Sequence, residues 1–152
     1  SRALALQVAG RAITLVDDSY NANPDSVRAA IEVLADLPGP RLLVLGDMGE
    51  IGNNGPQFHA EAGAQARERG IEQLFALGMQ SAEAAAAFGI GARHFDSMDA
   101  LQVAVRAALS DVASVLVKGS RFMRMERVVQ AATEAAPPSP SDRPAHVTGA
   151  TC

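Results

Sequence analysis

The chain has 152 residues, a length that suits one domain with a single hydrophobic core. Apolar residues make up 48% of it, but aromatic residues only 4% and Trp is absent, so a surface for stacking bases is not expected. The net charge is -4 and the Lys and Arg residues form no basic stripe, which argues against nucleic acid or an anionic membrane as a partner.

Cysteine usage and hydropathy favour a cytoplasmic location. The single cysteine, Cys152, is the last residue, so no internal disulfide can form and a reducing compartment is the simplest interpretation. No apolar run approaches the roughly 20 residues of a membrane-spanning helix, and the chain does not open with a signal peptide. It starts at Ser1 inside a predicted strand, which indicates a piece of a longer protein, and we expect a monomer.

The predicted elements alternate along the chain. Two short β-like runs, residues 4–8 and 12–16, are joined into a hairpin by a turn at residues 9–11. Beyond the hairpin, helices are predicted over residues 24–37, 56–69, 80–88, 98–109 and 123–135, and strands over residues 41–45, 73–77, 93–95 and 114–117.

This alternation predicts an α/β fold, a Rossmann-like and mostly parallel sheet with helices on both faces and a short N-terminal β-hairpin. Residues 1–135 form the domain, and the Pro-rich residues 136–152 are predicted to be a disordered tail. Ligands of such folds bind at the carboxyl ends of the strands. Polar segments follow three of the strands, at residues 17–23, 46–55 and 118–121, so we expect them to form one functional edge.

The first polar segment has the sequence DDSYNANPDS, from Asp17 to Ser26, and joins an apolar strand to a helix. Its carboxylates, hydroxyls, phenol and carboxamides offer more hydrogen-bonding groups than a plain connection needs. Asn, Asp and Ser are also the usual residues of turns and helix caps, so the composition alone fits a structural role equally well.

Glycines of the second segment, Gly46, Gly49 and Gly52, follow the spacing G-x-x-G-x-x-G and not the G-x-G-x-x-G of dinucleotide-binding loops. Asp47 and Glu50 would also repel a pyrophosphate held at a helix N-terminus. We therefore interpret the segment as a loop that moves or meets a neighbouring domain, with Asp47 as a contact for a ligand amine.

Two cations and a hydroxyl, from Lys118, Arg121 and Ser120, lie between the last strand and the last helix. Positive charge is unfavourable at a helix N-terminus, so these cations indicate an anionic ligand, a carboxylate or a phosphate. The structural alternative is that Ser120 caps the helix and both cations are solvated.

Other catalytic patterns are missing from the sequence. His59, His94 and His146 have no second ligand at metal-binding spacing, so we interpret them as structural or exposed. The sequence contains neither a Ser-His-Asp arrangement nor a G-x-S-x-G elbow, and it lacks a G-x-x-x-x-G-K-[ST] phosphate loop.

Two further interpretations stay open from the residues alone. Asp17, Asp18, Asp47 and Lys118 partly match the acidic site and lysine of a phospho-receiver domain, although Gly119 stands where a receiver has Pro. The second interpretation is a non-catalytic α/β binding module.

Four motifs in order, DDSYNANPDS, LGDMGEIG, LVKGSR and MERVV, resemble the C-terminal domain of the Mur ligase family, from about Val8 to Ala132. The resemblance is closest to the members that add D-alanyl-D-alanine to UDP-N-acetylmuramoyl-tripeptide. It implies an ATP-dependent amide ligase of peptidoglycan synthesis, which activates the peptide carboxylate as an acyl phosphate. ATP and Mg²⁺ would be held mainly by a central domain that this chain lacks.

The resemblance also implies roles for individual residues. The nucleotide would be contacted by Asp18, Tyr20, Asn21 and Asn23. The dipeptide would be contacted by Asp47, Lys118, Ser120 and Arg121. Because the phosphate loop and the catalytic groups belong to other domains of the family, this chain alone is expected to be inactive.

Overall fold

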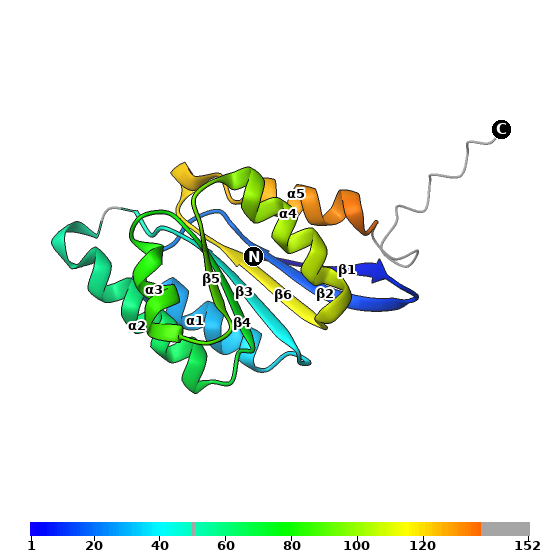
Figure 1. Ribbon diagram of the computed structural model, residues 1–152, viewed down its shortest axis with the longest axis horizontal. Coiled ribbons are helices and arrows are strands. Elements are labelled where there is room, and N and C mark those ends of the chain that lie inside the picture. The colour runs from blue at the N-terminus through cyan, green and yellow to red at the C-terminus, as the bar shows by residue number, and fades with distance from the viewer. Residues whose placement is uncertain (50, 138–152) are drawn as a thin grey trace.

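The computed structural model describes residues 1–49 and 51–137 of the chain. Its centre is a six-stranded sheet with the strand order β1-β2-β6-β3-β4-β5 (Figure 1). The strands are β1 (Arg2–Val8), β2 (Arg11–Asp18), β3 (Arg41–Gly46), β4 (Gln73–Leu77), β5 (Ala92–Phe95) and β6 (Ser114–Lys118). β1 pairs antiparallel with β2, and the other neighbouring pairs are parallel. The predicted sheet with its N-terminal hairpin is confirmed.

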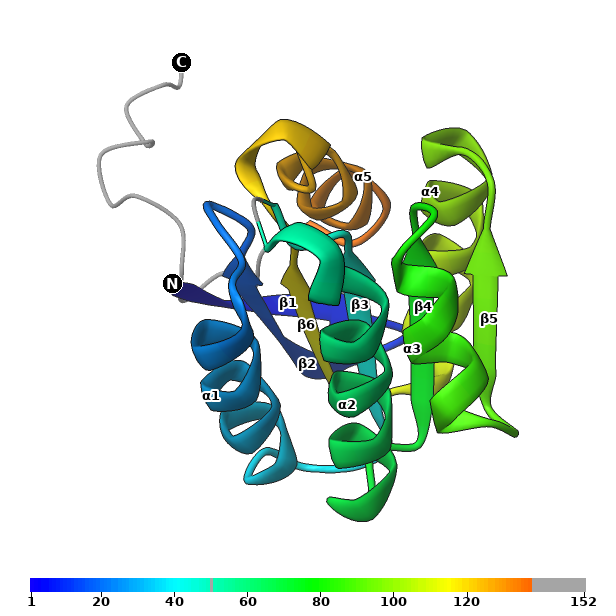
Figure 2. The ribbon, with the colours of Figure 1, turned by 90° about the vertical axis from the view of Figure 1, so that its left-hand side faces the viewer.

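Helices cover both faces of the sheet, as the second view makes plain (Figure 2). They are α1 (Pro24–Ala35), α2 (Gly55–Glu68), α3 (Ser81–Phe88), α4 (Met98–Ala108) and α5 (Glu126–Ala135). Side chains of β3 alternate between two cores: Leu42 and Val44 pack with α4 and α5, whereas Leu43 and Leu45 pack with α1, α2 and α3. Burial on both faces explains the continuous apolar strands in the sequence.

The start of α1 follows its sequence signals. Asn23 Oδ1 accepts the backbone N–H of Ser26 at 2.8 Å, and Ser26 Oγ accepts the backbone N–H of Asn23 at 3.0 Å. This reciprocal capping box fixes the point where the chain leaves β2 and turns into the helix. Pro24 occupies the first helical position, where its missing N–H has no intrahelical partner to lose.

The start of α5 differs from the prediction of a helix from residue 123. A 3-10 turn occupies Arg121–Met123, and α5 begins only at Glu126. Arg124 stands between them in the left-handed region, with φ 53°, so no continuous helix can pass through it. The break turns Met125 fully into the core, where a Cβ on Gly119 would lie only 2.5 Å from the Met125 Cγ. The segment 118–121 is therefore not at the N-terminus of an α-helix.

The described chain continues past α5 to Pro137. Ala136 is buried, and the Pro137 carbonyl accepts the backbone N–H of Gln7 at 3.1 Å, so these two residues pack against β1. Residues 138–152, with His146 and Cys152, lie outside the described residues, and the disordered tail stays a prediction. Among the helices of residues 1–49 and 51–137, none is long and apolar enough to cross a membrane.

Candidate functional site

The carboxyl ends of three neighbouring strands bring the predicted polar segments together. β2, β6 and β3 are adjacent in the sheet. Lys118, at the end of β6, pairs in register with Asp18 on β2 and with Leu45 on β3. The segments that follow these strands therefore share one edge of the sheet, which is the edge where ligands of parallel α/β sheets bind.

Lys118 connects two of these segments from below the surface. It is the only lysine of the chain, and just 2% of its surface is exposed. Its Nζ lies 3.0 Å from Asp18 Oδ2 and donates to the Asn21 carbonyl at 2.8 Å. A buried ammonium requires such partners, because burial removes its hydration. Two of its three N–H donors are thus engaged with protein groups, and its contact with a dipeptide stays a prediction.

Arg121 and Tyr20 connect the same two segments at the surface. Arg121 Nη1 donates to the Tyr20 Oη at 2.8 Å, and the guanidinium carbon lies 4.9 Å from the centre of the phenol ring. Tyr20 is 72% exposed. The guanidinium has five N–H donors in a rigid fork, so a pair this exposed leaves room for an anion to bind Arg121.

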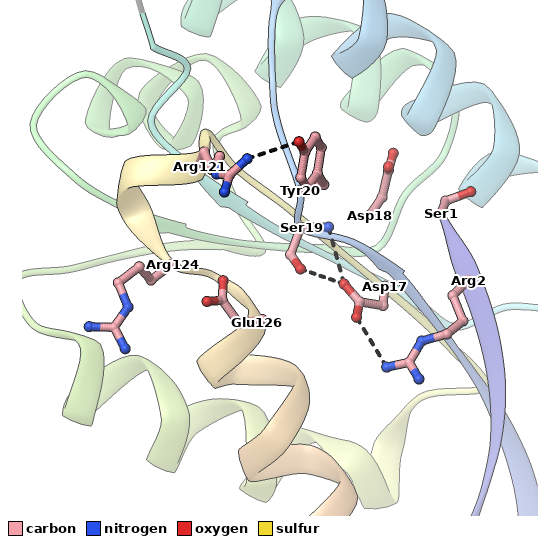
Figure 3. A pocket seen from close by; sticks show the side chains of 9 residues that line it. All are labelled: Ser1, Arg2, Asp17, Asp18, Ser19, Tyr20, Arg121, Arg124 and Glu126. Carbon is pink, nitrogen blue, oxygen red and sulfur yellow. Dashed lines mark hydrogen bonds and ion pairs between the residues drawn. The ribbon is translucent and has the colours of Figure 1, made fainter.

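An open groove of about 600 Å³ lies beside this pair (Figure 3). It is lined by Ser1, Arg2, Asp17, Asp18, Ser19, Tyr20, Arg121, Arg124 and Glu126. Asp17 is held there by the backbone N–H of Ser19 at 3.1 Å and by the Arg2 guanidinium at 3.3 Å. Carboxylates and guanidinium groups line the same groove, so it can contact a cationic and an anionic group of one ligand.

A second groove, of about 470 Å³, collects residues from all three polar segments. It is lined by Asn21, Ala22, Asn23, Gly49, Ile51, Ser120, Arg121 and Phe122. The Ser120 hydroxyl is buried here and has no hydrogen-bond partner among the described residues. A buried hydroxyl without a partner is unfavourable, so this one is suited to a polar group of a bound ligand. Below, this space is called the Ser120 groove.

The Asp47 side chain has a structural role that the sequence did not reveal. Its Oδ1 accepts the backbone N–H of Ser81 at 2.7 Å and its Oδ2 that of Gln80 at 3.3 Å, so it caps the N-terminus of α3. Its carbonyl accepts the backbone N–H of Ser120 at 3.0 Å, which fastens the loop after β3 to the end of β6. Asp47 lines neither groove among the described residues, and its contact with an amine stays a prediction.

Three expectations about caps and helix ends can now be compared with the structure. Asn23 does cap a helix, as the structural interpretation of the first segment required. Ser120 begins the 3-10 turn without a side-chain capping bond, so the structural alternative for that residue is wrong. The macrodipole argument for an anion is also wrong, because α5 begins five residues after Arg121 and the 3-10 turn is too short to supply one. What supports an anion there is the exposed guanidinium itself.

His59 and His94 take structural positions. His59 is fully buried and contacts the loop after β3, and His94 Nε2 lies 2.7 Å from the Gly78 carbonyl. No group of three or more His, Cys, Asp or Glu side chains among the described residues is arranged to hold a metal ion.

Sequence reasoning missed Arg124 and Glu126, which line the open groove. They appear in sequence as ordinary helix residues. No local signal marks the left-handed Arg124, because Gly or Asn usually occupies that conformation. The burial of Lys118 did have a signal, since a chain that uses arginine everywhere else places its single lysine at the end of an apolar strand.

Comparison with known proteins gives a consistent result. Residues 6–121 match the family described as Mur ligase, glutamate ligase domain. The UDP-N-acetylmuramoyl-tripeptide–D-alanyl-D-alanine ligase of Escherichia coli is 43% identical over 122 residues, which are 79% of this chain and 27% of that protein. The ligase of the same name from Bacillus subtilis is 34% identical over 129 residues, which are 78% of this chain and 27% of that protein.

Solved structures agree with this match. MurF from Acinetobacter baumannii superposes with a TM-score of 0.73 at 30% identity, covering 86% of this chain and 29% of that one. MurF from Thermotoga maritima, solved in complex with ADP, has the same fold, with a TM-score of 0.72 at 24% identity over 86% of this chain and 30% of that one. The chain thus spans less than a third of the length of these relatives. With the family match covering most of the domain, the chain belongs to the Mur ligase family, in its glutamate ligase domain.

Proposed function

We propose that this chain is the C-terminal domain of an ATP-dependent ligase that joins D-alanyl-D-alanine to UDP-N-acetylmuramoyl-tripeptide in peptidoglycan synthesis. The observation that carries the proposal is the common edge formed by the segments after β2, β3 and β6. Relatives whose printed name is that ligase align with 79% of the chain. The family membership also favours a ligase domain over a phospho-receiver or a non-catalytic module.

The proposed reaction transfers the terminal phosphoryl group of ATP to the tripeptide carboxylate, which gives an acyl phosphate and ADP. The free amine of the dipeptide then attacks the acyl carbon, loses a proton, and displaces inorganic phosphate as the amide bond forms. The phosphate loop and Mg²⁺ ligands of such an enzyme lie in its central domain. The described residues here hold no metal-binding cluster, so no step is assigned to Mg²⁺ in this domain.

For this domain we propose that the dipeptide binds in the Ser120 groove. Arg121 would hold its carboxylate with two parallel hydrogen bonds, and the unpartnered Ser120 hydroxyl would supply another. Lys118 would add positive charge from below, and Asp47 would face the ammonium group after a change in the loop after β3. Asp18 and Tyr20, which line the open groove, and Asn21 and Asn23, which line the Ser120 groove, would meet ATP as the central domain closes.

A direct test is a ligation assay with the full-length protein that carries this chain. ATP, UDP-N-acetylmuramoyl-tripeptide and D-alanyl-D-alanine are supplied together, and phosphate release is followed beside the ligated product. We expect one phosphate for each dipeptide consumed, and no release when the dipeptide is replaced by D-glutamate or L-lysine. Equal turnover with a single amino acid would assign the protein to another member of the family.

The isolated chain provides a complementary test. It is expected to hydrolyse no ATP and to form no product, since the reacting groups belong to other domains. ATP turnover by the purified chain would contradict the assignment of these groups. A cytoplasmic location and a monomeric state complete the proposal, and fractionation and light scattering of the full-length protein test them.

A further inference from the structure

His59 is a fully buried imidazole that the proposed chemistry does not use. It lies in the second turn of α2, directly behind the loop after β3. Its Nε2 lies 3.0 Å from the backbone nitrogen of Met48, and its Nδ1 lies 2.6 Å from the Gly55 carbonyl. One imidazole therefore joins the beginning of this loop to its end, where α2 starts.

The two partners define the tautomer. A backbone N–H can only donate, so the Met48 N–H requires a lone pair on Nε2, and the proton must sit on Nδ1. That proton then donates to the Gly55 carbonyl. Both ring nitrogens are satisfied in the neutral form, and the Met48 N–H, also buried, has a partner that no residue of the loop itself supplies.

The loop that His59 fastens forms part of the Ser120 groove. Gly49 and Ile51 line this groove together with Asn21 and Asn23. A Cβ on Gly49 would lie 3.3 Å from the Ser120 Cβ, so loop and β6 end are in close contact. A displacement of Met48 would therefore move Gly49, its chain neighbour, against Ser120 and change the wall of the groove.

We propose that His59 is a positioning residue that sets the shape of the Ser120 groove by holding Met48. It touches no ligand, and its effect on substrate binding passes through the Met48 N–H and Gly49. The expected effect on KM rests on the proposed function. The expected effect on the loop itself follows from the geometry alone. The bond to Met48 is the important one, because the bond to Gly55 joins residues within one helix turn.

Two substitutions separate the two bonds in the full-length protein. His59→Gln places an amide oxygen near the former Nε2 and can keep the bond to Met48, whereas His59→Asn reaches only the former Nδ1 position and keeps the bond to Gly55. We expect His59→Asn and His59→Ala to raise the KM for D-alanyl-D-alanine by roughly tenfold, the effect of one lost buried hydrogen bond. His59→Gln is expected to stay within about threefold of the wild type.

The KM for ATP shows whether the effect is specific to the dipeptide. In every His59 variant it should change less than the KM for the dipeptide. The matched control is Val105→Ala, a buried position in α4 on the opposite face of the sheet. It lowers the thermal midpoint without touching the loop, and both KM values should remain at wild-type levels. Equal increases for both substrates, or rescue by Asn but not by Gln, would overturn the proposal.

Amide hydrogen exchange tests the same inference without any activity. Peptides that cover residues 47–55 should exchange faster in His59→Ala and His59→Asn than in the wild type or His59→Gln, while peptides of α4 stay unchanged. Unaltered protection of the loop in His59→Ala refutes the positioning role even if the ligase assay succeeds. A wild-type protein without ligase activity refutes the proposed function and leaves this arm valid.

Discussion

The two edges of the sheet both carry arginines, but these arginines bind different partners. At the amino edge, Arg11 donates to the carbonyls of Ser110 and Val112, at 2.6 and 2.8 Å. Arg41 donates to the carbonyls of Ala35 and Gly70, at 2.6 and 2.9 Å. These carbonyls end helices or follow them, where positive charge is favoured by the helix dipole. Arginines at the amino edge therefore hold the fold together.

At the carboxyl edge, the partner of Arg121 is a side chain, the phenol of the exposed Tyr20. The neighbouring Ser120 hydroxyl has no partner among the described residues. Arg11 and Arg41 donate to backbone carbonyls of the fold, and Arg41 also pairs with Glu72, whereas the partner of Arg121 is an exposed side chain. The partners of these three arginines distinguish the two that build the fold from the one offered to a ligand.

The largest effect is expected for Lys118→Met, which removes the buried ammonium at the carboxyl edge. Asp18 and the Asn21 carbonyl then lose their partner. The free energy of unfolding should fall by about 2–4 kcal/mol, and the lower values apply because Asp18 is partly exposed. Urea unfolding measures this change. A loss of ligation with unchanged stability would instead give Lys118 the direct substrate contact that the sequence suggested.

Arg121→Ala gives the second largest effect, on binding. The KM for D-alanyl-D-alanine should rise roughly ten- to a hundredfold, the range for a lost charge-assisted hydrogen bond, with a smaller rise for ATP. The matched control is Arg41→Ala at the amino edge, which should lower the unfolding free energy and leave both KM values unchanged. If the two variants affect KM alike, the distinction between the edges fails.

Much of the fold and part of the candidate site could be predicted from the sequence. Periodicity located the strands, and the topology of parallel sheets then placed Asp18 and Lys118 at one edge. The cap at Asn23 followed from Asn-Pro. Arg121 and Tyr20 are 101 residues apart along the chain, so no local sequence pattern indicates that they pair. The same holds for Asp47, whose partner N–H groups belong to a helix that begins more than thirty residues later.

Asn23 sharpens the comparison, because its side chain has a defined structural role as the cap of α1. Asn23→Ala should cost about 1 kcal/mol of stability through the lost cap. Asn23→Asp keeps a capping oxygen and should remain within about 0.5 kcal/mol of the wild type, yet raise the KM for ATP because its negative charge faces phosphates. Ser97→Ala removes an equivalent cap on α4 and is expected to leave the KM for ATP unchanged. An unaltered KM in Asn23→Asp would return Asn23 to the fold alone.

The smallest effect belongs to the amino edge and depends on pH. Burial alone would raise the pKa of Glu72, but hydrogen bonds from the side chain and backbone of Arg41 outweigh it, so the pKa lies below its usual range. A carboxyl with a lowered pKa in the folded state stabilises the protein at neutral pH, and this contribution disappears as the pH falls through the folded pKa.

Glu72→Gln should therefore be less stable than the wild type at pH 7, by about 0.2–1 kcal/mol for an ion pair whose carboxylate is 42% exposed. The difference should shrink as the solution is acidified below the ordinary pKa of a glutamate, about 4.3. Urea unfolding at several pH values measures it, and high salt should reduce it further. Because Glu72 lies at the edge whose charges serve the fold, the substrate KM values should not change, and a change would show that the two edges are coupled through β3.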